Sequence, residues 1–200
     1  MTMWIKICGL TTPEAVTAAL DAGADAIGFV FAKSVRQVSA DMALRLAAPA
    51  RGRALCVAVT RHPSQRDVDE IVSVFKPDVL QTDSADLALL RLPTQLELLP
   101  VLRGAEAPAL PPRLLFEGLA SGAGVPCDWS AARRVARRTE LVLAGGLNPA
   151  NVAAAIAAVQ PFGVDVSTGV EVRPGVKSPA EIMNFVKAAR DASAVCEVRV

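Results

Sequence analysis

Eight short apolar runs, with helical patterns between most of them, constrain the fold more than any other feature of this sequence. Each run is apolar on both faces, which is typical of strands in a parallel sheet covered by helices. Eight strand–helix units in 200 residues predict an α/β fold, a compact (β/α)8 TIM barrel that takes up residues 1–200 as a single domain. The runs span Trp4–Cys8, Ala26–Phe31, Ala54–Val59, Asp78–Gln81, Leu96–Leu102, Leu114–Glu117, Leu141–Ala144 and Gly163–Ser167.

The segments between the runs carry the start signals of helices. One segment differs, because residues 103–113 contain Pro108, Pro111 and Pro112. Proline removes a backbone donor and obstructs a regular helix, so we expect the fifth helix to be reduced to a loop or a single turn. For the other helices, the expected N-caps are Thr12, Ser39, Ser64, Asp128, Asn148 and Ser178.

The composition argues against several classes of function. A net charge of +1, 4% aromatic residues and no tyrosine give neither a basic surface nor a stacking platform for nucleic acid. No apolar stretch approaches the ~20 residues needed to span a bilayer, and the start of the sequence lacks a signal-peptide pattern. We therefore expect a cytoplasmic protein without membrane partners.

His62 is the only histidine and the four cysteines form no C-x-x-C pair, so we expect neither a metal site nor a Ser-His-Asp triad.

Cys8 is the first candidate for chemistry. It ends the first apolar run and is followed by Gly9, which allows a turn, and by a helix start at Thr12-Pro13. Active sites of (β/α)8 barrels lie at the carboxyl ends of their strands. Free cysteine is also among the most buried residue types, so its position alone leaves Cys8 either a reactive thiol or a small core residue. We expect structural roles for Cys56, Cys127 and Cys196.

Two loops late in the chain carry residue types that bind phosphate. Gly145 and Gly146 follow the seventh run, and Ser167, Thr168 and Gly169 follow the eighth. Glycine lets the backbone approach phosphate oxygens, hydroxyl groups add donors, and a helix N-terminus favours negative charge. Barrels of this class often bind phosphate with the loops after strands seven and eight. We therefore predict a phosphorylated small-molecule substrate that is held there.

Several motifs occur together in an order that resembles the phosphoribosylanthranilate isomerase family, over about residues 4–190. The resemblance implies a cofactor-free (β/α)8 barrel of tryptophan biosynthesis whose fifth helix is commonly a loop. It also implies the activity, the Amadori rearrangement of N-(5-phosphoribosyl)anthranilate to 1-(2-carboxyphenylamino)-1-deoxyribulose 5-phosphate. The motifs are Lys6-Ile-Cys8-Gly9-Leu10, residues 22–31 followed by Ser34-x-Arg36, Ser121-Gly-x-Gly124, Asp128-Trp129, residues 145–149 and residues 163–171.

The same resemblance implies roles for four residues. The family's general base is the cysteine of the K-x-C-G motif, which corresponds to Cys8, and its general acid is an aspartate that ends strand six, which corresponds to Glu117. Arg36 corresponds to the residue that binds the anthranilate carboxylate. Asp165 corresponds to an aspartate that contacts the amino or ribose groups, and it is the second candidate for the acid. Because a thiol has a reference pKa of about 8.5, Cys8 needs surroundings that favour the thiolate to act as a base.

The sequence departs from the family pattern at three positions. Glu117 replaces the usual aspartate, Val35 replaces a proline between Ser34 and Arg36, and Asp83 replaces the histidine of a Q-x-H-G motif. The departures leave a second hypothesis open, a catalytically silent phosphate-binding barrel that binds a metabolite or a partner protein. An indole-glycerol-phosphate synthase needs a lysine–glutamate pair and a sugar-phosphate epimerase needs histidine ligands, so both fit less well. The choice between a monomer and a homodimer stays open.

Overall fold

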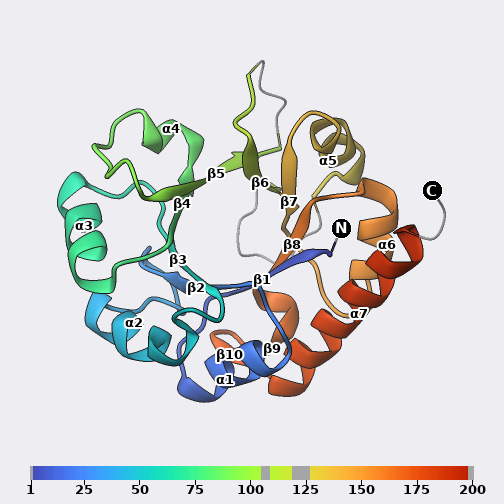
Figure 1. The fold of residues 1–200 in the computed structure, drawn as a ribbon, viewed down its shortest axis with the longest axis horizontal. Coiled ribbons are helices and arrows are strands. Elements are labelled where there is room, and N and C mark those ends of the chain that lie inside the picture. Colours follow the sequence, from blue (N-terminus) through green and yellow to red (C-terminus); the bar gives the residue numbers. More distant parts are fainter. Residues whose placement is uncertain (1, 105–108, 119–126, 198–200) are drawn as a thin grey trace.

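Eight parallel strands pair in sequence order and close into a barrel in the computed structural model of the chain, which describes residues 2–104, 109–118 and 127–197 (Figure 1). Each predicted apolar run coincides with or overlaps one of these strands, so the expectation of a (β/α)8 barrel is confirmed. The strands are β1 (Trp4–Cys8), β2 (Ala26–Val30), β3 (Leu55–Val59), β4 (Val79–Asp83), β5 (Glu97–Arg103), β6 (Arg113–Glu117), β7 (Glu140–Leu143) and β8 (Gly163–Val166).

The barrel closes where β1 pairs with β8. Lys6 and Asp165 are direct partners across this seam, and Trp4 is the partner of Gly163. A Cβ atom on Gly163 would lie 2.7 Å from the backbone oxygen of Trp4. Glycine therefore allows the close approach of the first and last strands at this position.

Successive side chains of a strand point to opposite faces, so every second residue points into the barrel. In the first layer these residues are apolar, with Val79 on β4 and Leu115 on β6 among them. Two residues later on the same strands, the inward positions are Gln81 and Glu117, which line a pocket. The alternation that builds the apolar layer thus also brings polar side chains together at the carboxyl ends of the strands.

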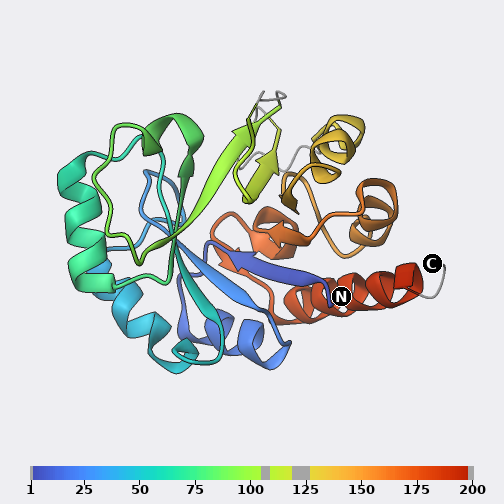
Figure 2. The same cartoon turned by 45° about the horizontal axis from the view of Figure 1, so that its top comes forward.

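The helices lie outside the barrel, and α7 runs along β1 and packs between α1 and α6 (Figures 1 and 2). None of the described helices combines the length and the apolar character needed to cross a membrane. The helices are α1 (Pro13–Asp21), α2 (Ala40–Ala47), η1 (Ala48–Ala50), α3 (Gln65–Glu70) with the π-helical η2 (Ile71–Phe75), α4 (Ser84–Leu87), α5 (Trp129–Ala136), α6 (Val152–Val159), η3 (Thr168–Val170) and α7 (Pro179–Glu197).

Helix starts follow the predicted caps except in one case. Asn148 is not the N-cap of α6, because its side chain accepts hydrogen bonds from the backbone of Ala150 and Asn151 in a turn. This turn delays the helix, which begins at Val152. The side chains that accept a first-turn backbone N–H as predicted are those of Thr12, Ser39, Ser64, Asp128 and Ser178.

The connection from β5 to β6 is not helical at Gly104 or at residues 109–112. This agrees with the expectation that the helix between the fifth and sixth strands is reduced to a loop or a single turn. Pro108 lies outside the described residues. The preceding helix α4 has only 4 residues. The barrel wall around β5 therefore has less helical cover than the wall beside α6, α7 and α1 (Figure 1).

A short hairpin of β9 (Glu171–Arg173) and β10 (Val176–Lys177) lies between η3 and α7. The hydroxyl group of Thr11 donates a 3.2 Å hydrogen bond to the backbone oxygen of Gly175 in its turn. A Cβ atom on Gly175 would lie 2.9 Å from the backbone oxygen of Val35. The hairpin turn thus packs closely against the loop that carries Arg36.

Candidate active site

A pocket of about 290 Å³ opens at the carboxyl ends of the strands. The structure brings five of the predicted site residues into its lining, although they come from β1, β6, β8 and the loops after β2 and β8. They are Cys8, Arg36, Glu117, Asp165 and Ser167. Because the pocket lies at the end where (β/α)8 enzymes hold their substrates, it is the candidate active site.

Cys8 lies beside a buried ion pair. Lys6 has no solvent exposure, and its Nζ donates a 2.8 Å hydrogen bond to Oδ1 of Asp165. A Cβ atom on Gly28, which neighbours Cys8 on β2, would lie 3.0 Å from the thiol Sγ and 3.2 Å from the Lys6 Nζ. Gly28 therefore leaves the space that the thiol and the ammonium group share.

Burial raises the pKa of the Cys8 thiol, although the nearby charges of Lys6 and Lys177 act in the opposite direction. Burial also lowers the pKa of Lys6, but attraction to Asp165 and to Cys8 outweighs it, so the pKa of Lys6 is raised overall. Lys6 is therefore held as a cation, chiefly by Asp165, next to a thiol whose pKa is raised. The site without substrate thus supplies the positive charges that favour a thiolate, but burial of Cys8 outweighs them.

Arg36 is oriented by Glu171 at the start of the hairpin. Its Nε donates to Oε1 of Glu171 at 2.7 Å and its second terminal nitrogen donates to Oε2 at 2.8 Å. Gly9 has a φ of +77°, and a Cβ atom there would lie 2.6 Å from Cδ of Arg36. The glycine of the turn after Cys8 thus permits the arginine stem to cross toward Glu171.

Glu171 receives a second cation from the hairpin. Nζ of Lys177 lies 2.8 Å from Oε1 of Glu171 and 2.9 Å from the backbone oxygen of Ser167. Burial by itself raises the pKa of Glu171, but the hydrogen bonds from Arg36 and Lys177 outweigh it and lower the pKa to about 2. Burial lowers the pKa of Lys177, and Glu171 opposes this effect. The three side chains form one largely buried charge cluster, and Arg36 extends it to the pocket lining.

Glu117 lies at the end of β6 and forms an ion pair with Arg103 at the end of β5. Arg103 in turn donates from Nε to Oδ1 of Asp83 on β4, over 2.8 Å. The guanidinium group is thus shared by carboxylates on the two flanking strands. Both carboxylates considered for the general acid are paired with a cation, Glu117 with Arg103 and Asp165 with Lys6.

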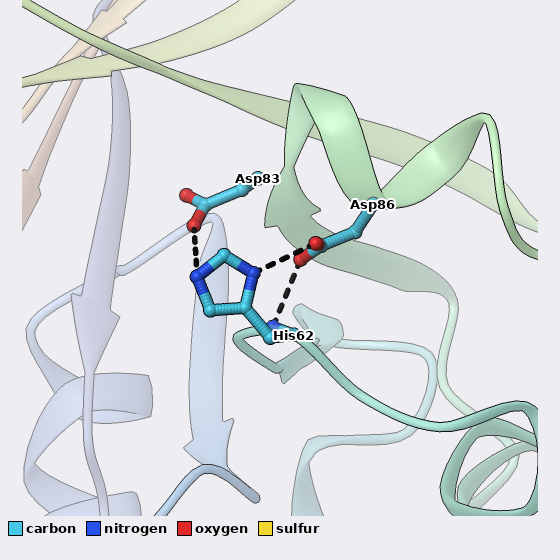
Figure 3. Close-up of side chains that lie close together, drawn as sticks. All are labelled: His62, Asp83 and Asp86. Atoms are coloured by element: carbon cyan, nitrogen blue, oxygen red, sulfur yellow. Dashed lines mark hydrogen bonds and ion pairs between the residues drawn. The ribbon is translucent and has the colours of Figure 1, made fainter.

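His62, Asp83 and Asp86 form a cluster next to this ion pair (Figure 3). Nδ1 of His62 lies 2.9 Å from Oδ1 of Asp86, and Nε2 lies 3.8 Å from Oδ2 of Asp83. The three ligand atoms lie within 4.8 Å of one another, so a potential metal-ligand set exists that the sequence did not suggest. Because Arg103 already pairs with Asp83, a metal cation there would have to compete with a guanidinium group.

The two predicted phosphate loops lie against each other. Gly145 and Gly146 follow β7 with φ values of +91° and +64°, which glycine adopts readily. A Cβ atom on Gly169 would lie 1.9 Å from the backbone oxygen of Leu147, so the loop after β8 touches the loop after β7. Ser167 lines the pocket, and Thr168 begins the η3 turn beside it.

Several side chains at or near the site were given no role from the sequence. Lys6 and Gln81 stand in motifs of the resemblance without a role of their own, and Arg103 and Lys177 carried no signal. The closed barrel buries Lys6, Gln81 and Lys177 and places Gln81 and Arg103 in the pocket lining. Within the described part of the chain, Oε1 of Gln81 is buried without a hydrogen-bond partner. The Ser121-Gly-x-Gly124 motif lies outside the described residues.

The closed barrel and the ionisable groups gathered at the carboxyl ends of its strands place the chain in the class of (β/α)8-barrel enzymes. The family model described as N-(5'phosphoribosyl)anthranilate (PRA) isomerase matches residues 5–188. The chain belongs to this family, as the resemblance of its motifs indicated. It is an isomerase of tryptophan biosynthesis.

Relatives of known name and structure agree with this assignment. An N-(5'-phosphoribosyl)anthranilate isomerase of Rhizobium leguminosarum bv. trifolii is 42% identical over 95% of each chain. The crystal structure of TrpF from Jonesia denitrificans is 34% identical, with a TM-score of 0.80 over 96% of this chain and 98% of that one. The phosphoribosyl anthranilate isomerase of Thermotoga maritima is 28% identical, with a TM-score of 0.79 over 94% and 99%.

The Glu171 cluster predicts a pH-dependent contribution to stability. Because the pKa of Glu171 falls from 4.5 to about 2 on folding, its contribution is present above pH ~4.5 and is lost as the pH falls toward ~2. We expect Glu171→Gln to lower the free energy of unfolding by about 3 kcal/mol at pH 7, since it leaves Lys177 and Arg36 buried with one partner fewer. Denaturant unfolding at several pH values measures this.

Glu140→Gln is the matched control, because Glu140 pairs with Arg113 at an exposed position. Exposed ion pairs contribute at most about 1 kcal/mol. A difference between wild type and Glu171→Gln that does not shrink as the pH falls below about 4 would contradict the assignment.

Proposed function

We propose that this pocket performs the Amadori rearrangement of N-(5'-phosphoribosyl)anthranilate with Cys8 as general base and Glu117 as general acid. The aldose–ketose isomerisation itself follows from the membership of the family. The observation that supports the residue roles is the position of Cys8, Glu117 and Asp165 around one pocket of about 290 Å³. A thiol on β1 and a carboxylate on β6 that line one pocket suit a base and an acid that act on one substrate.

In this proposal the acid acts first. Because Glu117 rests as the ion-pair partner of Arg103, it first takes up a proton from water. It then protonates the ring oxygen of the ribose, the bond from that oxygen to C1 breaks, and the open chain carries a positively charged imine at C1. Cys8 then takes the proton from C2. The resulting enol loses the proton of its C2 hydroxyl group and gains one at C1, which gives the C2 ketone. The proton that Cys8 took and the proton that Glu117 gave are exchanged back through water, so atoms and electrons balance overall.

The charges around Cys8 support its role as the base. The imine nitrogen that becomes positive on ring opening adds to the fixed charge of Lys6, and nearby positive charge favours a thiolate. The thiol therefore loses its proton most readily when the open-chain intermediate is in place. This order is consistent with the raised pKa of Cys8 in the resting site.

We propose that the remaining predicted residues bind the substrate. Gly145, Gly146, Ser167, Thr168 and Gly169 would hold the phosphate with backbone N–H groups and hydroxyls, and the touching loops after β7 and β8 support this. A solved phosphoribosyl anthranilate isomerase that is 28% identical holds reduced 1-(o-carboxyphenylamino)-1-deoxyribulose 5-phosphate.

The guanidinium group of Arg36 suits the anthranilate carboxylate, because two parallel hydrogen bonds fit the two groups. Glu171 presets the direction of Arg36 for this contact. Asp165 is placed to accept hydrogen bonds from the amino or ribose groups while Lys6 holds one of its oxygens. Oε1 of Gln81, which lines the same pocket, is a further acceptor for a ribose hydroxyl.

Three broader features are part of the same proposal. We propose that the chain acts as a single domain over residues 1–200, in the cytoplasm, as a monomer or a homodimer. The barrel elements from β1 to α7 support one domain. Among the solved relatives is a set of monomers made from the dimeric phosphoribosylantranilate isomerase of Thermotoga maritima, so both states occur in this fold.

Turnover tests the proposal against a catalytically silent barrel. Wild-type protein should remove phosphoribosylanthranilate, made from anthranilate and phosphoribosyl pyrophosphate by the preceding transferase, faster than it decays, which is followed by the loss of fluorescence. Cys8→Ala should lower kcat by about 10²- to 10⁴-fold, the usual contribution of a general base. Cys56→Ala is the control, since Cys56 is buried outside the pocket. Full activity of Cys8→Ala would remove the thiol from the mechanism.

A second pair of variants separates the two candidate acids. Glu117→Gln should lower kcat by about 10²-fold or more and leave the affinity for the reduced product analogue near that of wild type, because the amide keeps the shape but is too weak an acid to protonate the ring oxygen. Asp165→Asn should raise KM more than it lowers kcat. The reverse result, with Glu117→Gln active and Asp165→Asn inactive, would transfer the acid role to Asp165.

Gly146→Ala tests the phosphate site. The added Cβ atom strains a backbone with φ of +64° and crowds the approach of the phosphate, so KM should rise roughly tenfold with kcat changed less. Gly52→Ala is the matched control, because Gly52 has a φ of +75° and no neighbouring atoms within 4 Å of the added Cβ. Equal KM values for the two variants would speak against phosphate binding at Gly146.

A further inference from the structure

We propose that Arg103 is a positioning residue that fixes the direction of the Glu117 carboxylate, and that Asp83 holds Arg103 in place for this task. The proposal rests on the role of Glu117 as general acid. It joins two positions at which this sequence departs from its family pattern, because a single guanidinium group connects Asp83 with Glu117.

The three side chains belong to consecutive strands. Asp83 ends β4, Arg103 ends β5 and Glu117 ends β6, and strand pairing sets Asp83 opposite Val101 and Arg103 opposite Glu117. All three side chains are largely buried, with exposed fractions of 13%, 19% and 13%. Charge-assisted hydrogen bonds between such side chains are directional, so they fix the orientation of the groups that they join.

A second side chain faces Asp83 from the other side. Its Oδ1 accepts from Arg103 at 2.8 Å, while its Oδ2 faces Nε2 of His62 at 3.8 Å. Asp86 fixes His62 by accepting from its backbone N–H at 2.9 Å and by contacting its ring at 2.9 Å (Figure 3). The contacts thus run from the loop after β3 to the end of β6, and of the contacts that Asp83 makes with Arg103 and His62, the one with Arg103 is the hydrogen bond.

Glu117 needs such support for a geometric reason. A glutamate has one more rotatable bond than an aspartate, so its carboxylate can point in more directions. A misplacement of about 1 Å can cost about a hundredfold in rate. The fixed arrangement of donors on Arg103 limits these directions, because the guanidinium group must serve Asp83 and Glu117 at once. A neutral histidine at position 83 would offer the guanidinium group no negative charge.

The test compares kcat and KM of Arg103 variants in the turnover assay. Arg103→Met removes the charge and keeps the length of the side chain, and it should lower kcat about ten- to hundredfold with KM changed about threefold or less. Arg103→Lys should recover part of kcat, since a cation returns without the planar fork. Arg113→Met is the matched control, because Arg113 pairs with Glu140 at the opposite end of β6, and it should keep the wild-type kcat.

A double-mutant cycle separates positioning from a structural role. In the Glu117→Gln background, Arg103→Met should change kcat by less than about twofold, because a residue that acts only through Glu117 has nothing left to position. Asp83→Asn should lower kcat in the wild type and add little to Arg103→Met. Thermal unfolding and the affinity for the reduced product analogue show that each variant is folded.

Two results would overturn the proposal while the acid role survives. The first is a wild-type kcat in the Arg103→Met variant. The second is that Arg103→Met lowers kcat by the same factor in the Glu117→Gln background as in the wild type, which would mean that Arg103 acts independently of Glu117. A fully active Glu117→Gln variant gives a different pattern. It would overturn the acid role, and with it the proposal that this acid is positioned.

Discussion

The buried ion pair between Lys6 and Asp165 connects the first strand of the barrel to the last, and the site depends on it. Nζ of Lys6 and Oδ1 of Asp165 are 2.8 Å apart, and the lysine has no exposed surface. Moving two charges out of water is unfavourable and offsets much of their attraction, so we infer that the pair mainly fixes the strand register. A slip of one residue would turn Cys8 away from the interior.

Three further cations at or near the pocket also have carboxylate partners. Arg36 and Lys177 share Glu171, and Arg103 lies between Asp83 and Glu117. Pairing of this kind holds long side chains in one direction before a substrate arrives. In a reaction that moves protons between neighbouring atoms, groups that are already oriented need little rearrangement at the moment of transfer.

Most of the fold could be predicted from the sequence because the strands and helix caps depend on local patterns. The apolar run from Trp4 to Cys8 became β1, and Ser64 caps α3 with the expected geometry. Asn148 misled the prediction, because an Asx turn and a helix N-cap use the same side chain and differ only in the backbone conformation of the next few residues. Among the residues that motifs marked, Cys8 and Arg36 line the pocket.

The sequence by itself determined the eight-stranded barrel, the thiol at the end of β1 and the two glycine loops after β7 and β8, because each depends on residues close together in the chain. Only the tertiary structure decided that Arg103 lies between Asp83 and Glu117 and that Lys6 pairs with Asp165, 159 residues away. Such pairs arise from barrel closure, which sets side chains of neighbouring strands side by side whatever their distance in sequence.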